Sequence, residues 1–79
     1  MEKQDIISSV QSIMSNLSGI DIEDITPESK LQEDLDFDLL TTIELAMNLE
    51  DEFYVVFPDA DIANFTTVSD IVEHIYQNI

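Results

Sequence analysis

Carboxylates are the side chains of this sequence that offer the most chemistry, and three of them stand at alternate positions, Asp34, Asp36 and Asp38. Acid–base catalysis by a pair of carboxylates needs a sheltered site that separates their pKa values. A single domain of 79 residues buries one modest core, and we expect it to enclose no active-site cavity. The 18 acidic residues therefore predict loose association of cations, without a structural metal site or a catalytic pair.

The other residue types that carry chemistry are scarce. His74 is the single histidine, and Asp70 and Glu73 beside it form a poor metal-ligand set. It also lacks a visible nucleophile and pocket for work as a general base, so we expect a surface or core-edge residue. The chain has no cysteine, which excludes disulfides and thiolate chemistry, and its one glycine, Gly19, excludes a glycine-rich phosphate loop. These observations predict that the chain is not an enzyme.

The charge balance limits the partners that this chain can have. Its net charge is −16, and Lys3 and Lys30 are the only basic residues apart from the histidine. Nucleic acids and anionic membrane surfaces would repel it, whereas proteins with basic patches would attract it in a salt-dependent way. The N-terminal residues do not resemble a leader, and no apolar run reaches membrane-spanning length. We expect a monomer in the cytoplasm.

Apolar periodicity predicts helices for most of the chain. A first helix is expected from about Lys3 to Leu17, ended by Ser18 and Gly19, with an apolar stripe of Ile6, Ile7, Val10, Ile13, Met14 and Leu17. A long loop over residues 20–37 follows. Its expected anchors in the core are Ile20, Ile22, Ile25, Leu31 and Leu35.

The second half of the chain predicts three more helices. The second helix should run from Leu39 to Phe53 or Tyr54, and residues 54–57 should form a connector, since they have no partner strand. A short third helix is expected over residues 59–64. The last helix should open with a capping box of Thr67 and Asp70, and its expected buried stripe is Val68, Ile71, Val72, Ile75 and Ile79. The fold prediction is one all-α domain, residues 1–79, with four helices.

The second helix is unusual because apolar residues occur on both of its sides. Asp38 suits its N-cap, since a carboxylate there accepts hydrogen bonds from the free N–H groups of the first turn. One side carries Leu45, Ala46, Leu49 and Phe53. The other carries Leu39, Leu40, Ile43, Met47, Glu50 and Asp51. A chain this small can bury one of these sides well, so we expect the second side to meet a partner, although a stripe at this spacing is more commonly plain core.

This stretch resembles the acyl carrier protein family, whose signature is an Asp-Ser-Leu triplet at the start of the second helix. Asp38 and Leu40 match the first and third positions, and the middle position is Leu39. Residues 43–45 and 49–53 match the helix that follows, and the long first loop and the Thr66–Thr67–Val68 opening of the last helix extend the resemblance over most of the chain. The glycine that the family has two residues before the aspartate is Asp36 here.

The resemblance implies a function and a set of sites. The family carries acyl chains for fatty-acid or polyketide synthesis as thioesters on a 4′-phosphopantetheine arm, which a transferase attaches to the serine of the triplet. The resemblance implies a cofactor position at Asp38, Leu39 and Leu40, and a short third helix. It also implies contacts with the phosphopantetheinyl transferase and with acyl-transfer or synthase enzymes that have basic surfaces. The implied partner-binding residues are Leu40, Ile43, Glu44, Met47, Glu50 and Asp51.

Leu39 leaves three interpretations of the function open, because its side chain has no oxygen that could carry the arm. The chain can be a working carrier with a substitution, natural or introduced, at its attachment serine. It can instead be a binding module that engages carrier-using enzymes without an arm, as a decoy, scaffold or regulator. A third interpretation abandons the family and keeps only an acidic helical adaptor. In each of them, no phosphopantetheine can be attached at Leu39.

Overall fold

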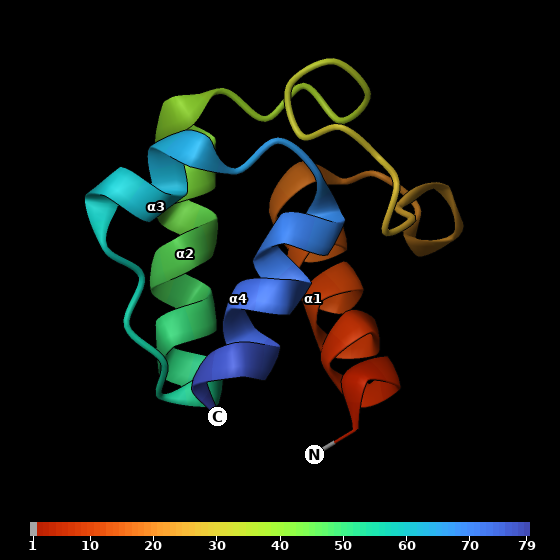
Figure 1. Ribbon diagram of the computed structural model, residues 1–79. Coiled ribbons are helices and arrows are strands. Elements are labelled where there is room, and N and C mark those ends of the chain that lie inside the picture. Colours follow the sequence, from red (N-terminus) through yellow and green to blue (C-terminus); the bar gives the residue numbers. More distant parts are fainter. Residues whose placement is uncertain (1) are drawn as a thin grey trace.

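The computed structural model describes residues 2–79 and consists of helices joined by loops (Figure 1). Its elements in chain order are α1 (Lys3–Ser18), the 3-10 helix η1 (Ile22–Asp24), α2 (Leu39–Phe53), α3 (Asp59–Asn64) and α4 (Val68–Asn78). Helix α1 packs against both α2 and α4, and α3 packs against α2. Pairing between strands is limited to one isolated bridge between Lys30 and Thr67 in the described part of the chain. The predicted all-α, four-helix fold with a short third helix is confirmed.

Local signals in the sequence set the helix ends. Gly19 ends α1 in the left-handed conformation, at φ 77°, and its N–H donates to the Ser15 carbonyl over 2.8 Å. The predicted capping box opens α4: the Thr67 hydroxyl accepts from the Asp70 N–H at 3.3 Å, and the Asp70 carboxylate accepts from the Thr67 N–H at 3.0 Å. Helix α2 spans the predicted residues, and so does α3.

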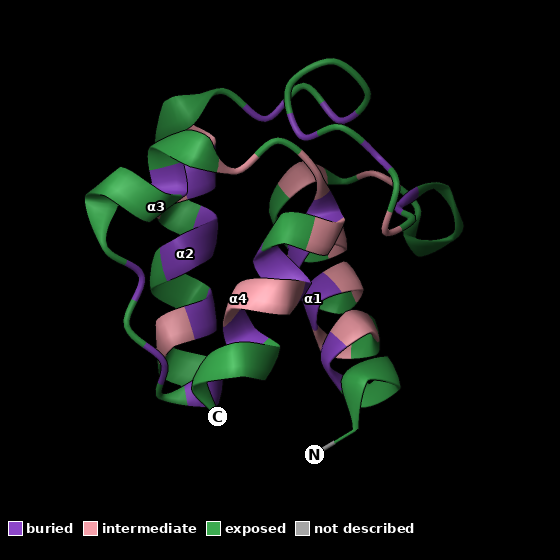
Figure 2. Ribbon diagram, viewed as in Figure 1, coloured by how far each residue is buried: buried purple, intermediate pink, exposed green. Residues whose placement is uncertain are grey.

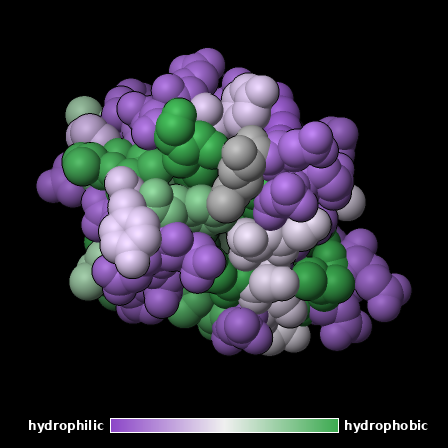
Figure 3. All heavy atoms as spheres, turned by 90° about the horizontal axis from the view of Figure 1, so that it is seen from below, coloured by the Kyte–Doolittle hydropathy of each residue, from purple (hydrophilic) through white to green (hydrophobic). Residues whose placement is uncertain are grey.

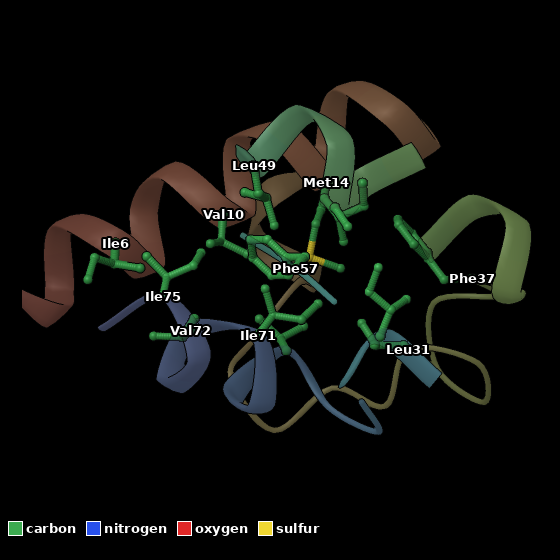
Figure 4. Close-up of a cluster of buried hydrophobic side chains, with 14 of the residues drawn as sticks. Ile6, Val10, Met14, Leu31, Phe37, Leu49, Phe57, Ile71, Val72 and Ile75 are labelled. Carbon is green, nitrogen blue, oxygen red and sulfur yellow. The ribbon is translucent and has the colours of Figure 1, made fainter. Parts of the chain in front are cut away.

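The core lies between α1, α2 and α4, where each helix turns one side inward (Figure 2). Figure 4 shows Phe57 of the connector inserted among side chains of these helices. The fully buried members from the helices include Ile6, Val10, Met14, Leu45, Leu49, Val68 and Ile75. Burial of this apolar surface is the main driving force for the fold.

Three expected core residues are exposed. Leu17 lies in the last turn of α1 and is 36% exposed. Ile22 starts η1 on the outer side of the first loop, while Ile25 takes the inward position. Ile79 lies beyond the end of α4 at Asn78 and is 54% exposed. All three expectations were wrong because apolar spacing alone does not show where a packed turn ends.

The long first loop is ordered by hydrogen bonds to the segment that opens α4. The Leu31 N–H donates to the Thr66 carbonyl at 2.9 Å, and the Val68 N–H donates to the Ser29 carbonyl at 3.1 Å. A further bond from the Phe37 N–H to the Leu31 carbonyl, 2.7 Å long, closes the loop just before α2. The loop thus ties the residues just before α2 to the segment that opens α4. None of the helices within residues 2–79 is both long and apolar enough to cross a membrane.

Candidate functional site

The start of α2 is held by Asp38. Its carboxylate accepts a hydrogen bond from the Thr41 N–H at 2.8 Å, as predicted for an N-cap. Its carbonyl accepts from the Thr42 N–H at 3.0 Å and from the Thr42 hydroxyl at 2.8 Å. The Thr41 N–H favours the charged carboxylate and lowers the pKa of Asp38 below its usual value. The first turn of α2 is therefore fixed in position and carries a negative charge at its head.

Two leucines follow the cap and are open to solvent. The Leu39 residue is 59% exposed and Leu40 is 66% exposed, so the three consecutive residues from Asp38 form one accessible helix start. A group attached here through an ester needs a hydroxyl, and the Leu39 side chain is a hydrocarbon. The buried Thr42 hydroxyl already donates to the Asp38 carbonyl. The residue after the cap therefore does not fit covalent attachment of an arm.

An open hollow of about 400 Å³ lies beside this helix start, between the first loop, α2 and α3. Its apolar wall is formed by Leu31, Phe37, Leu39, Ile62 and Phe65. Lys30 lies at its edge, with its ammonium 3.3 Å from the Glu33 carboxylate. Sequence reasoning did not predict this hollow, because Phe37 and Phe65 lie outside the helices and belong to no periodic pattern.

The second side of α2 divides into an open part and a part that supports the fold. Met47 is 60% exposed, like Leu40, and Glu44 and Asp51 are also exposed. Ile43 is half-buried and packs against the core. Glu50 is half-buried as well, and its carboxylate accepts from the Phe57 N–H at 2.9 Å, which fastens the connector to α2. No pattern in the sequence indicates this structural contact of Glu50.

His74 lies at the edge of the core, where it joins α4 to the connector. Its Nε2 atom is 2.8 Å from the Val56 carbonyl, and its ring centroid is 4.6 Å from that of Phe57. Its Nδ1 atom is 4.0 Å from the Asp61 carboxylate. These contacts assign the histidine a packing role and agree with the expected core-edge position.

Sequence comparisons relate this chain to a known family and to individual proteins. The family described as a phosphopantetheine attachment site matches residues 8–75. The chain is 40% identical over 77 residues to the acyl carrier protein of Thermotoga maritima, covering 98% of this chain and 95% of that protein. It is 38% identical over 73 residues to the meromycolate extension acyl carrier protein of Mycolicibacterium aurum, covering 92% of this chain and 75% of that protein.

A solved structure extends the match to three dimensions. The acyl carrier protein of Enterococcus faecalis superposes over 100% of both chains with a TM-score of 0.82 and 29% sequence identity. The matched family carries a 4′-phosphopantetheine group, and its members are carriers that work with synthase and acyl-transfer enzymes. The fold, the capped start of α2 and these matches show that the chain belongs to the acyl carrier protein family.

Proposed function

We propose that the chain has the carrier surface of an acyl carrier protein and that Leu39 occupies the position of the attachment serine. The observation that carries this proposal is the order of residues at the start of α2: the cap Asp38, then Leu39 as the exposed first helical residue, then the exposed Leu40. A modifying enzyme needs such an accessible residue. The side chain at that residue lacks the oxygen that the arm requires, so the chain as it stands remains without phosphopantetheine.

The proposed partner surface is the exposed part of the second side of α2. Leu40 and Met47 offer apolar contacts, and Glu44 and Asp51 offer carboxylates next to them. Ile43 supports the apolar contacts from a half-buried position, and Glu50 contributes charge while it holds the connector. The partners in this proposal are a phosphopantetheinyl transferase and acyl-transfer or synthase enzymes with basic surfaces, which a chain of net charge −16 attracts.

The function that this fold would support is transport of acyl intermediates in fatty-acid or polyketide-type synthesis. Meromycolate extension, which is named for the mycobacterial relatives, is one such process. Transport needs an attached arm. Asp38 and Leu40 on either side of Leu39 match the family's signature, whereas Asp36 stands in place of its glycine. The chain acts by presenting its surface to enzymes and not by catalysis. We further propose a monomer, because its charge opposes self-association, and a cytoplasmic location, which rests on the family.

The test is the intact mass of three proteins after incubation with coenzyme A and a broad-specificity phosphopantetheinyl transferase. These are the chain itself, Leu39→Ser, and the matched control Leu40→Ser, which places a hydroxyl one residue further on at an equally exposed site. We expect only Leu39→Ser to gain the mass of the arm. That result would mean that the transferase still reads the surface and that Leu39 alone prevents modification.

Two other results would contradict the proposal. Modification of Leu40→Ser would move the attachment position by one residue. Failure of every form to gain mass would mean that the fold is kept while the working surface is lost, and would favour an arm-independent binding module. Circular dichroism of each variant shows that the helices are intact before the masses are compared.

A further inference from the structure

A second group of exposed apolar side chains lies at the opposite end of α2 from Asp38. Tyr54 directly follows the helix and is 93% exposed. With Phe53, Tyr76 and Ile79 it borders an open hollow of about 600 Å³, and Glu52 supplies a carboxylate at the rim. We call these five residues the aromatic end. Figure 3 shows the molecule from below, the side on which α2 and α4 end, with hydrophobic surface beside hydrophilic residues.

Tyr54 occupies a backbone conformation that does not suit a large side chain. It ends α2 at φ 55° and ψ 39°, and its N–H donates to the Glu50 carbonyl over 2.9 Å. This left-handed region favours glycine, and a bulky residue there is uncommon. The ring gains little from packing within the chain, because it is almost fully exposed. Backbone strain of this kind is concentrated at functional sites, and for Tyr54 we infer that its ring contacts another molecule.

The other tyrosine at this end, Tyr76, already interacts with a cation. The Lys3 ammonium lies 5.6 Å from the centroid of the Tyr76 ring and pairs with the Glu73 carboxylate. A cation over an aromatic face next to a carboxylate is a favourable arrangement. Tyr54 and Glu52 offer the same pair of groups, while the other lysine of the sequence, Lys30, pairs with Glu33 elsewhere. Within residues 2–79 both lysines are engaged elsewhere, so we expect the cation at Tyr54 to come from a partner.

We propose that the aromatic end is a second docking surface and that its occupant is a basic amphipathic helix of a partner protein. Such a helix carries apolar and cationic side chains three and four residues apart on one side. Its apolar residues enter the hollow, and a lysine or arginine lies over the Tyr54 ring beside Glu52. A second copy of the chain is a poor occupant, because each copy has a net charge of −16. The proposal does not depend on Leu39 or on an attached arm.

The chain contains a natural reporter for this surface. Tyr54 and Tyr76 are its only tyrosines, and it has no tryptophan, so intrinsic fluorescence comes from the aromatic end. The probe is a synthetic helical peptide of leucine and lysine. Its control is a peptide of the same composition, permuted so that no apolar side forms. We expect the amphipathic peptide to change the tyrosine fluorescence and to bind about tenfold more tightly than the permuted one.

Two variants locate the binding. Tyr54→Asn removes the ring and keeps a residue that tolerates the left-handed conformation, and we expect it to weaken binding of the amphipathic peptide about tenfold. Ile22→Asn is the matched control, since it removes an exposed hydrophobic residue of η1, outside both proposed surfaces, and its affinity should stay within about twofold. Amide chemical shifts of both variants verify the fold.

Four results would overturn the proposal. The peptides could fail to bind, or the permuted peptide could bind as tightly, in which case charge alone acts. Ile22→Asn could weaken binding as much as Tyr54→Asn, in which case the loss would not be specific to the aromatic end. Sedimentation of the chain without peptide could show a dimer that Tyr54→Asn abolishes, which would make a second copy the occupant. The transferase assay at position 39 is separate, so failure of either proposal leaves the other testable.

Discussion

The two sides of α2 carry similar residues and meet opposite surroundings. Leu45 and Leu49 are fully buried against the rest of the bundle, whereas Leu40 and Met47 are mostly exposed. Composition does not explain this difference, since both pairs are apolar and sit at helical spacing. The packing of α2 explains it, because α1, α3 and the shared core cover Leu45 and Leu49 while the side with Leu40 and Met47 stays open to solvent. An apolar stripe therefore identifies a surface that excludes water, either inside the fold or against a partner.

The largest difference in the free energy of unfolding should come from truncating one leucine on each side of α2. Leu45→Ala removes a fully buried side chain and should lower the free energy of unfolding by about 2–5 kcal/mol, because it leaves a cavity. Leu40→Ala, five residues earlier on the exposed side, should change it by about 0.5 kcal/mol or less. Urea denaturation followed by circular dichroism measures both. Equal losses of stability would mean that the side of α2 with Leu40 is packed in solution and not open to solvent.

The two left-handed helix ends should respond with opposite signs. Tyr54→Gly relieves the strained end of α2 and should raise the free energy of unfolding by up to about 1 kcal/mol, after the greater freedom of glycine in the unfolded chain is taken into account. Gly19→Ala introduces strain at the end of α1 and should lower it by about 1 kcal/mol.

An added Cβ at Gly19 meets no atom within 4 Å, so any loss measured there reports backbone strain and not a clash. Thermal denaturation of the two variants and the parent chain provides the measurement. A loss of stability in Tyr54→Gly would show that the Tyr54 ring packs within the chain, and would weaken the case for a partner at the aromatic end.

Leu39→Ser should have a small effect on stability. The residue is 59% exposed at the first turn of α2, so its replacement should change the free energy of unfolding by about 0.5 kcal/mol or less. Solubility should not fall, because an exposed apolar group next to Leu40 is removed. Denaturation and light scattering test the two statements. A loss of several kcal/mol would mean that Leu39 is buried and that α2 is rotated from the orientation described above.

The smallest effect concerns Asp38 and pH. The lowered pKa of this carboxylate means that its stabilising effect is present above the unfolded-state pKa of about 3.9 and is lost as the pH falls through the lower folded value. Asp38→Asn keeps an acceptor for the Thr41 N–H and removes the charge, so this part of the acid dependence should disappear. Urea midpoints of both proteins from about pH 5 to about pH 2 test this. Parallel curves would show that the cap does not distinguish the charged from the neutral form.

Much of the candidate site could be predicted from the sequence because its defining features are local. The Asp38 cap needs only the N–H of Thr41, three residues away, and residues 38–40 adjoin one another in any helix that starts there. The role of Glu50 could not be predicted, because its hydrogen bond to the Phe57 N–H depends on how the connector turns back. The same holds for the hollow beside Leu39, whose wall comes from the first loop, α2 and α3 together.

The helix ends, the extreme negative charge and the absence of a hydroxyl at residue 39 follow directly from the order of the residues. Capping residues, glycine conformation and side-chain composition act within a few residues, so these features do not depend on the rest of the fold. The packing of the bundle sets which side of α2 is buried and places His74 on Phe57. It also leaves Leu17, Ile22 and Ile79 exposed. Burial depends on which elements meet in space, and that is a property of the packed bundle as a whole.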